Sequence, residues 1–292
     1  MKKKRNIWLL YALITTVFWG VWGAFTEKSA YNGTVIYIIW SVIMLIPALI
    51  ALRNIGWKPE TDKKSILYGL IIGFLGAGGQ LILFTGAIAN GPAFLIFPII
   101  SLSPVLTILL SIIFLKEKAS VRGWIGIILA LIAIPFLSYQ DPDNHFAKGF
   151  LWLVFALLVF AAWGLQAYFM KFANNRMKAE SIFFYMTLTG LALAPVAWFM
   201  TDSSELQNIH WNLKDVGLTA LVQILNAIGA LTIVYAFRYG KAIIVSPLTN
   251  AVAPVITVII SLFLYNTIPH ILIITGMVLA ILSMFVLAFE DS

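Results

Sequence analysis

Apolar runs of membrane-spanning length alternate with short polar connections along the whole chain. A helix needs about 20 apolar residues to cross the hydrocarbon core of a bilayer. On that length the sequence predicts ten spanning helices, with connections too short to hold a soluble domain. The expected helices cover residues 7–26, 34–52, 66–88, 92–115, 122–138, 149–170, 181–200, 215–237, 242–264 and 269–289. The first run continues beyond signal-peptide length and lacks an A-x-A-like cleavage site, so we expect an uncleaved helix.

Composition agrees with a membrane protein of many spans. Apolar residues make up 61% of the chain and charged residues 11%, with a mean hydropathy of +0.97, whereas soluble domains are about half apolar and a quarter charged. The absence of cysteine excludes a disulfide framework, a thiolate metal site and a cysteine nucleophile. A net charge of +7 would suggest nucleic acid for a soluble chain. Here the basic residues lie in short loops, so we expect no nucleic-acid partner.

The distribution of positive charge predicts the orientation of the chain. With a cytoplasmic amino terminus and ten spans, 16 of the 19 Lys and Arg residues fall on the cytoplasmic side. Only Lys28, Lys148 and Lys214 fall outside. Because positive residues concentrate in cytoplasmic loops, we expect a multi-pass protein of the plasma or inner membrane with both termini cytoplasmic.

The second half of the chain repeats the first. Trp19-Gly20 returns as Trp163-Gly164 at an offset of 144 residues. At an offset of 150, the residues Pro104, Val105, Thr107, Ser111, Gly126, Leu129 and Ala130 return as Pro254, Val255, Thr257, Ser261, Gly276, Leu279 and Ala280. Each unit holds five segments, an odd number, so the second unit enters from the opposite side of the membrane. The predicted fold is an all-α membrane protein of ten transmembrane helices, arranged as two inverted-topology five-helix repeats (1–140 and 141–292) in one integrated membrane domain.

Two corresponding segments, 97–110 and 245–260, each contain two prolines. They are Pro98 and Pro104 in the first, and Pro247 and Pro254 in the second. Proline removes a backbone donor and presses on the carbonyl four residues back, so each helix is expected to kink or open. Paired, interrupted segments in two halves point to a transporter's binding site, and we predict hinges at the four prolines. Alternatively, the prolines kink two ordinary packing helices.

Several motifs occur at corresponding places of the two halves or along the fourth predicted helix. They are FWGVWGAF (18–25), AAWGLQAYF (161–169), the segment NGPAFLIFPIISLSPVLTILLSIIFLKEKAS (90–120), and a G-x-x-x-A in the fifth and tenth predicted helices. Together these motifs resemble the EamA branch of the drug/metabolite transporter superfamily. The resemblance covers essentially the whole chain and implies a ten-helix transporter with a central cavity, commonly a metabolite or drug exporter. It also implies a Glu at the cytoplasmic end of the fourth helix, which Glu117 matches, while residues 264–267 of the second half carry none. Glu117 is therefore a candidate gate, and a solvated ion pair is the alternative.

The predicted helix interiors contain no carboxylate, since all twelve Asp and Glu residues fall outside them. Ionisable residues within spans mark proton relays and ion pathways, so a buried proton carrier is not expected. Intramembrane enzymes need an acid, base or metal ligand at reacting depth. We therefore expect no enzymatic activity, no metal and no cofactor. Any coupling would involve peripheral groups such as Glu27.

The candidate substrate-binding residues are neutral and polar or aromatic. Amides donate and accept hydrogen bonds without placing charge in lipid, and two of the tryptophans lie well inside their segments instead of at the interface. The candidates are Trp19, Trp22, Gln80, Phe84, Ser101, Trp163, Gln166, Asn226, Thr249 and Asn250. The alternative is that the amides hold helices together and the tryptophans pack.

These features favour an alternating-access transporter of small organic metabolites, such as amino acids or drug-like solutes, working as an exporter or exchanger. Its partners would be a small-molecule substrate and the lipid bilayer. Gly126 with Ala130, and Gly276 with Ala280, predict tight packing of the fifth and tenth helices, either within one chain or at a dimer face, so we expect a monomer or homodimer. A lipid-carrier flippase and a non-transporting scaffold or receptor subunit are alternatives.

Overall fold

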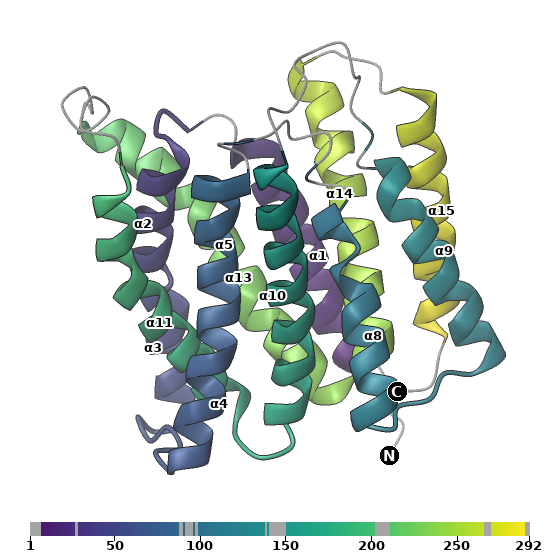
Figure 1. Ribbon diagram of the computed structural model, residues 1–292, viewed down its shortest axis with the longest axis horizontal. Helices are drawn as coiled ribbons and strands as arrows, with labels where there is room; N and C mark the ends of the chain where they lie inside the picture. The colour runs from purple at the N-terminus through teal and green to yellow at the C-terminus, as the bar shows by residue number, and fades with distance from the viewer. Residues whose placement is uncertain are drawn as a thin grey trace.

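The chain folds into a bundle of helices standing side by side (Figure 1). The computed structural model describes residues 7–26, 29–87, 90, 96, 99–137, 139, 150–201, 211–265 and 270–289. Within those ranges every regular element is helical, as the all-α prediction requires. The start of α1 and the end of α15 lie at the same end of the bundle, at the bottom of Figure 1.

The helices of the first half follow the predicted order. They are α1 (Ile7–Thr26), α2 (Gly33–Ile43), α3 (Leu45–Asn54), α4 (Lys63–Gly73), η2 (Phe74–Gly78), α5 (Gly79–Ile82), η3 (Leu83–Ala87), α8 (Ser103–Phe114) and α9 (Val121–Leu137). The second half contains α10 (Leu151–Ala173), α11 (Ala179–Phe199), α13 (Leu213–Tyr239), α14 (Ala242–Tyr265) and α15 (Ile271–Ala288).

Eight helical segments in the described residues are long and apolar enough to cross a membrane. Two shorter apolar helices, Ile99–Phe114 and Val121–Leu137, lie where the sequence predicts the fourth and fifth spans. The protein is therefore a multi-pass membrane protein with helices at the ten predicted places. That all ten cross the bilayer remains a prediction.

The third segment is not a regular α-helix. Between α4 and Ala87 it contains two π-helical stretches, η2 and η3, separated by the single turn of α5. Such wider turns often occur at functional sites. The apolar run in the sequence predicts a spanning helix here but gives no sign of the wider turns.

The expectation that α14 opens at its prolines is wrong in this conformation. The helix is continuous from Ala242 to Tyr265, with Pro247 and Pro254 inside it. Neighbouring side chains bind the helix carbonyls near Pro247: Thr249 Oγ1 donates to Val245 O, and Asn250 Nδ2 donates to Ser246 O. Pro247 leaves the carbonyl of Ile243 without its intrahelical donor, and membrane helices tolerate such a break where neighbouring helices and local adjustments of the backbone compensate for it.

The corresponding segment of the first half is interrupted. A turn at Leu102 separates the helical residues 99–101 from α8, and Pro104 lies in the first turn of α8. Proline is tolerated there because the first helical N–H groups have no partner within the helix. Pro98 lies outside the described residues. The hinge roles of the prolines remain predictions.

Helices of one half pack mainly on helices of the other. The first helix of the first half, α1, packs on α13 and α14, which are the third and fourth segments of the second half. The first helix of the second half, α10, packs on α8 and on the segment from α4 to η3, which are the fourth and third segments of the first half. The two halves are thus interleaved with the same pairing in both directions, as an inverted repeat predicts.

Equivalent residues make equivalent contacts at the two crossings. Thr257 Oγ1 donates to the carbonyl of Gly20 at 2.9 Å, and Thr107 Oγ1 donates to the carbonyl of Gly164 at 3.0 Å. A Cβ added to Gly20 would lie 2.9 Å from the carbonyl oxygen of Ala253, and one added to Gly164 would lie 2.9 Å from that of Ser103. The repeated glycines therefore let two backbones meet closely enough for a threonine to join them.

The G-x-x-x-A helices α9 and α15 pack against each other within one chain. A Cβ added to Gly126 would meet the Leu287 side chain at 2.7 Å, and one added to Gly276 would meet the backbone nitrogen of Leu137 at 2.8 Å. Ser283 Oγ donates to the carbonyl of Gly126 at 2.9 Å. The predicted tight packing is confirmed as an intrachain contact.

The two threonine bonds predict matched losses of stability. Thr257→Val and Thr107→Val keep the side-chain shape but remove the donor, so each should lower the free energy of unfolding by about 0.6 kcal/mol, the average for hydrogen bonds between membrane helices. Thr275→Val is the control, because Thr275 Oγ1 bonds only to Ile271 O of its own exposed helix turn. Thermal unfolding in detergent measures all three, and a loss confined to one of the two test variants would show that the crossings are not equivalent.

Candidate functional site

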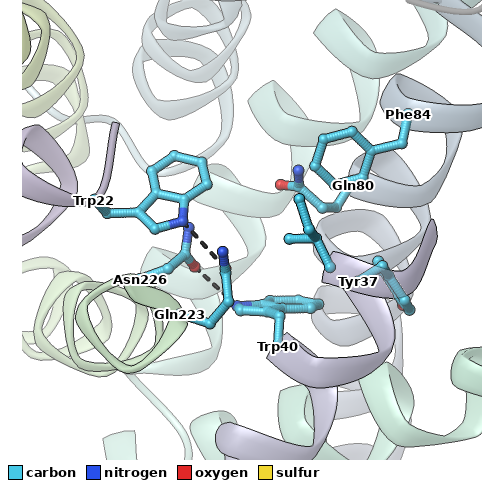
Figure 2. Close-up of a pocket in the computed structure, with 8 residues that line it drawn as sticks. Trp22, Tyr37, Trp40, Gln80, Phe84, Gln223 and Asn226 are labelled. Carbon is cyan, nitrogen blue, oxygen red and sulfur yellow. Dashed lines mark hydrogen bonds between the residues drawn. The ribbon is translucent and has the colours of Figure 1, made fainter. Parts of the chain in front are cut away.

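A small pocket lies between helices of the two halves. Its cavity volume is about 10 Å³, room for about one water molecule, and it is lined by residues of α1, α2, α5, η3 and α13 (Figure 2). The lining residues are Trp22, Ile36, Tyr37, Trp40, Gln80, Phe84, Gln223 and Asn226. Asn226 is the central residue of α13, so the pocket lies near the middle of the bundle.

Two tryptophans of the first half hold two amides of the second. Trp22 Nε1 donates to Gln223 Oε1 at 3.1 Å, and Trp40 Nε1 donates to Asn226 Oδ1 at 2.9 Å. Both bonds are drawn as dashed lines in Figure 2. The amides come from one helix face because positions three apart in α13 are neighbours. The pocket is thus closed on one side by an ordered row of indoles and amides.

Aromatic and apolar side chains form the rest of the wall. Phe84, in η3, packs over Gly33 at the start of α2. Tyr37 is buried, and its hydroxyl donates to the carbonyl of Gly190 at 3.5 Å, away from the pocket. Gln80 stands in α5 between the two π-helical stretches. Those wider turns therefore belong to the segment that places Gln80 and Phe84 in the wall.

Four of the ten predicted substrate-binding residues line this pocket: Trp22, Gln80, Phe84 and Asn226. Trp19 lies next to them, with its indole N–H donating to the backbone carbonyl of Asn226 at 3.3 Å. Trp19 also covers Gly229, just as Trp163 covers Gly79 in the other half.

The other predicted residues lie elsewhere. Gln166 packs on Gly76 of the third segment. Thr249 and Asn250 donate to carbonyls of their own helix α14, and Ser101 is partly buried before α8. Substrate roles for these residues and for Trp163 remain predictions.

Sequence reasoning missed Ile36, Tyr37, Trp40 and Gln223. Gln223 could have been predicted from the sequence, because it lies three residues before Asn226 on a mainly apolar helix and therefore on the same helix face. Trp40 could not, because the sequence does not show which tryptophan of the second segment would meet α13.

Glu117 lies just after α8, at the end of the bundle where α14 begins, and its side chain is largely buried. Its side chain is 8% exposed, and its Oε2 accepts from the backbone N–H of Ile243 in the first turn of α14 at 3.1 Å. The Lys171 ammonium lies 3.9 Å from Oε1 and donates to the carbonyl of Gly240 at 2.6 Å. A carboxylate is favourable at a helix N-terminus, so Glu117 joins the fourth segment to the start of the ninth. The alternative of a solvated ion pair is wrong.

Burial dominates the ionisation of Glu117. Loss of hydration raises the pKa of its carboxyl above the ordinary value, although the N–H groups of Ile243 and Ala242 and the charge of Lys171 oppose that shift. Glu117 Oε1 accepts no hydrogen bond in the described structure, which makes the ionised carboxylate still less favourable there.

No group of three or more His, Cys, Asp or Glu side chains that could hold a metal ion occurs in the part of the chain described by the structure. The pocket consists of amides, aromatic rings and one aliphatic side chain. Its chemistry is that of binding by hydrogen bonds and apolar contact.

A family comparison identifies the architecture. The model of the EamA-like transporter family matches residues 6–139 and again residues 150–289. The chain belongs to the EamA-like transporter family. Each match covers one of the interleaved halves, so the two halves are copies of one family unit.

Two further likenesses agree with this assignment. An uncharacterized protein of Methanocaldococcus jannaschii is 33% identical over 135 residues, an alignment that covers 46% of this chain and 97% of that protein. The alignment thus covers nearly the whole of a protein about half as long as this chain. A crystal structure with 15% sequence identity superimposes with a TM-score of 0.77, covering 96% of this chain and 98% of the other. At that identity the likeness shows the fold alone.

The buried carboxyl predicts a pH-dependent stability. Because the pKa of Glu117 is higher in the folded than in the unfolded protein, its contribution is fully present below the unfolded pKa and is lost as pH rises through the folded pKa. Glu117→Gln should remove this decline, which thermal unfolding from mildly acidic to neutral pH would measure.

Asp62→Asn is the control. A hydrogen bond with Ser65 is the main cause holding the pKa of Asp62 below its ordinary value, so its contribution has the opposite sign and is lost on acidification. An unchanged pH profile for Glu117→Gln would show that the carboxyl titrates as in the unfolded chain.

Proposed function

We propose that this EamA-family protein moves small organic metabolites across the plasma or inner membrane by alternating access. The solute would bind in the pocket between the halves, and transport would be facilitated export or exchange. The observation that supports this most is the composition of the pocket wall: Trp22, Trp40, Gln80 and Phe84 come from one half, and Gln223 and Asn226 from the other. Relative movement of the halves would therefore change the site itself.

The packing supports a conformation closed at one end. Near the start of α1 and α14 and the end of α10 and α13, one apolar cluster joins both halves, and within it Trp8, Met170, Phe237 and Ile243 are at most 4% exposed. In the predicted orientation this would be the cytoplasmic end. The described pocket lies farther along the bundle, beyond this cluster, so packed side chains would block its path to the cytoplasm.

Glu117 would act as a latch in this closed state. It is bonded to the N-terminus of α14 and lies beside Lys171 of α10, so three segments of the two halves meet there. Opening toward the cytoplasm requires α14 to leave this carboxylate. A carboxylate at one half only, with no counterpart at residues 264–267, would make the two closed ends unequal.

The transport proposal is tested by filling the pocket. Proteoliposomes containing the protein should show saturable flux of at least one solute from a panel of amino acids, nucleosides and sugars. Phe84→Trp enlarges a pocket-lining ring and should reduce that flux at least about tenfold, by analogy with the sensitivity of closely packed sites to added volume. Phe74→Trp, in the same segment but 61% exposed, is the matched control and should retain flux.

Both variants are first checked for monodisperse, folded protein. Flux that survives Phe84→Trp would place the solute path elsewhere. A protein that moves no panel solute but copurifies with a partner would favour the scaffold alternative.

Because the natural sequence contains no cysteine, single introduced cysteines can test the predicted orientation. Lys58→Cys lies in an exposed connection expected inside, and Lys214→Cys lies at an exposed helix start expected outside. In intact cells a membrane-impermeant maleimide should label the second variant and not the first, and disrupted cells should give labelling of both. The reverse pattern would invert the proposed topology.

A further inference from the structure

We propose that Trp22 and Trp40 orient the amides of Gln223 and Asn226 so that the pocket selects small, apolar solutes carrying a hydrogen-bond acceptor, such as a carbonyl or carboxylate. This inference rests on the proposed transport function and names the chemical class of its solute. The two indoles are positioning residues, because they act on the solute only through the amides that they hold.

The orientation of the amides follows from the chemistry of indole. An indole N–H donates and never accepts, so the atom that it meets in each amide is the carbonyl oxygen. The distances are 3.1 Å from Trp22 Nε1 to Gln223 Oε1 and 2.9 Å from Trp40 Nε1 to Asn226 Oδ1. Each amide is planar, so fixing its oxygen also fixes the direction of its NH₂ group.

The fixed NH₂ groups are left as donors without acceptors. Gln223 is 2% exposed, and its Nε2 has no hydrogen-bond partner in the described structure. Figure 2 shows this nitrogen directed toward the gap between Trp22 and Gln80. No described residue accepts from Asn226 Nδ2 either. A buried donor without a partner is unfavourable, so an acceptor on a solute would satisfy a group that the protein leaves unpaired.

The charge of the pocket selects against cations. None of the eight lining side chains is a carboxylate, a lysine, an arginine or a histidine. An ammonium group would therefore meet the positive ends of N–H dipoles with no counterion beside it. A carbonyl or carboxylate oxygen would meet the same dipoles with favourable sign.

The remaining wall defines the body of the solute. The rings of Trp22, Trp40 and Phe84 and the side chain of Ile36 offer apolar contact. Ligand pockets range from about 300 to 1,000 Å³, whereas the cavity here has a volume of about 10 Å³ in this conformation. The walls therefore have to move apart for a solute to bind, and their apolar side chains favour a compact solute body, such as a single ring or a short aliphatic chain.

Three matched probes test the selection directly. Phenylacetate, phenylacetamide and phenethylamine share a ring and a short chain, and their heads are an acceptor, an acceptor with donors, and a donor alone. Binding to the purified full-length protein is measured by tryptophan fluorescence and by the shift in thermal unfolding. Phenylacetate and phenylacetamide should bind about tenfold more tightly than phenethylamine. That difference is expected because the first two supply an acceptor to a buried amide donor, whereas phenethylamine leaves that donor unpaired.

Two kinds of variant test the named residues. Trp40→Phe keeps a ring but frees the Asn226 amide to turn, so the preference for phenylacetate over phenethylamine should fall toward equality. Gln223→Glu keeps the acceptor for Trp22 and replaces the donor with a second oxygen, so the preference should reverse. Asn175→Asp adds a carboxylate at an exposed position outside the pocket and should leave the preference unchanged.

The outcomes separate this inference from the transport proposal. Equal binding of the three probes, no binding of any of them, or a preference unaffected by both Trp40→Phe and Gln223→Glu would overturn the inference, whatever the flux measurements show. The predicted preference, with its loss in Trp40→Phe and its reversal in Gln223→Glu, would support it. That result would stand even if the panel of solutes showed no flux, which bears on transport alone.

Discussion

The close approach of two pairs of backbones, at Gly20 and at Gly164, is the constraint on which the structure depends. In a bilayer the lipid is as apolar as a helix surface, so burial of apolar side chains gives little reason for helices to associate. Contact must come from close packing and from hydrogen bonds between helices. At each crossing a glycine supplies the room and a threonine supplies the bond, and each crossing joins helices of different halves. Each half therefore packs mainly on helices of the other half.

This constraint also positions the pocket. Because α1 is held on α13 and α14, its tryptophans face the middle of α13, where Gln223 and Asn226 stand. The pocket is asymmetric although the scaffold is repeated. At positions equivalent to Trp22 and Asn226 the other half has Gln166 and Gly76, which pack directly against each other. One copy of the unit therefore fills its equivalent site with protein, and the other leaves a space.

Much of the fold could be predicted because it follows from hydrophobic run length, charge and repetition, which are properties of the sequence itself. The helices, their order and the glycine contacts of α9 with α15 fall where these patterns place them. The site was only partly predictable. Trp22, Gln80, Phe84 and Asn226 were found because polar and aromatic groups at mid-helix are unusual in lipid. Trp40 was missed because its role depends on a neighbour far along the chain. The continuity of α14 was missed because the effect of a proline on a membrane helix depends on the helices packed around it, which the sequence does not show.

The lone carboxylate at Glu117 has a consequence for energetics. An inverted repeat with identical halves would have two states of equal free energy, related by a two-fold rotation about an axis in the membrane plane, and neither face of the membrane would be preferred. Here a buried acid ties the beginning of α14 to the end of the fourth segment, and the corresponding residues 264–267 of the second half include no acid. If the protein works by the proposed alternating access, the empty protein would favour the state in which this tie is intact. One side chain, remote from the pocket, would then make a repeated scaffold directional.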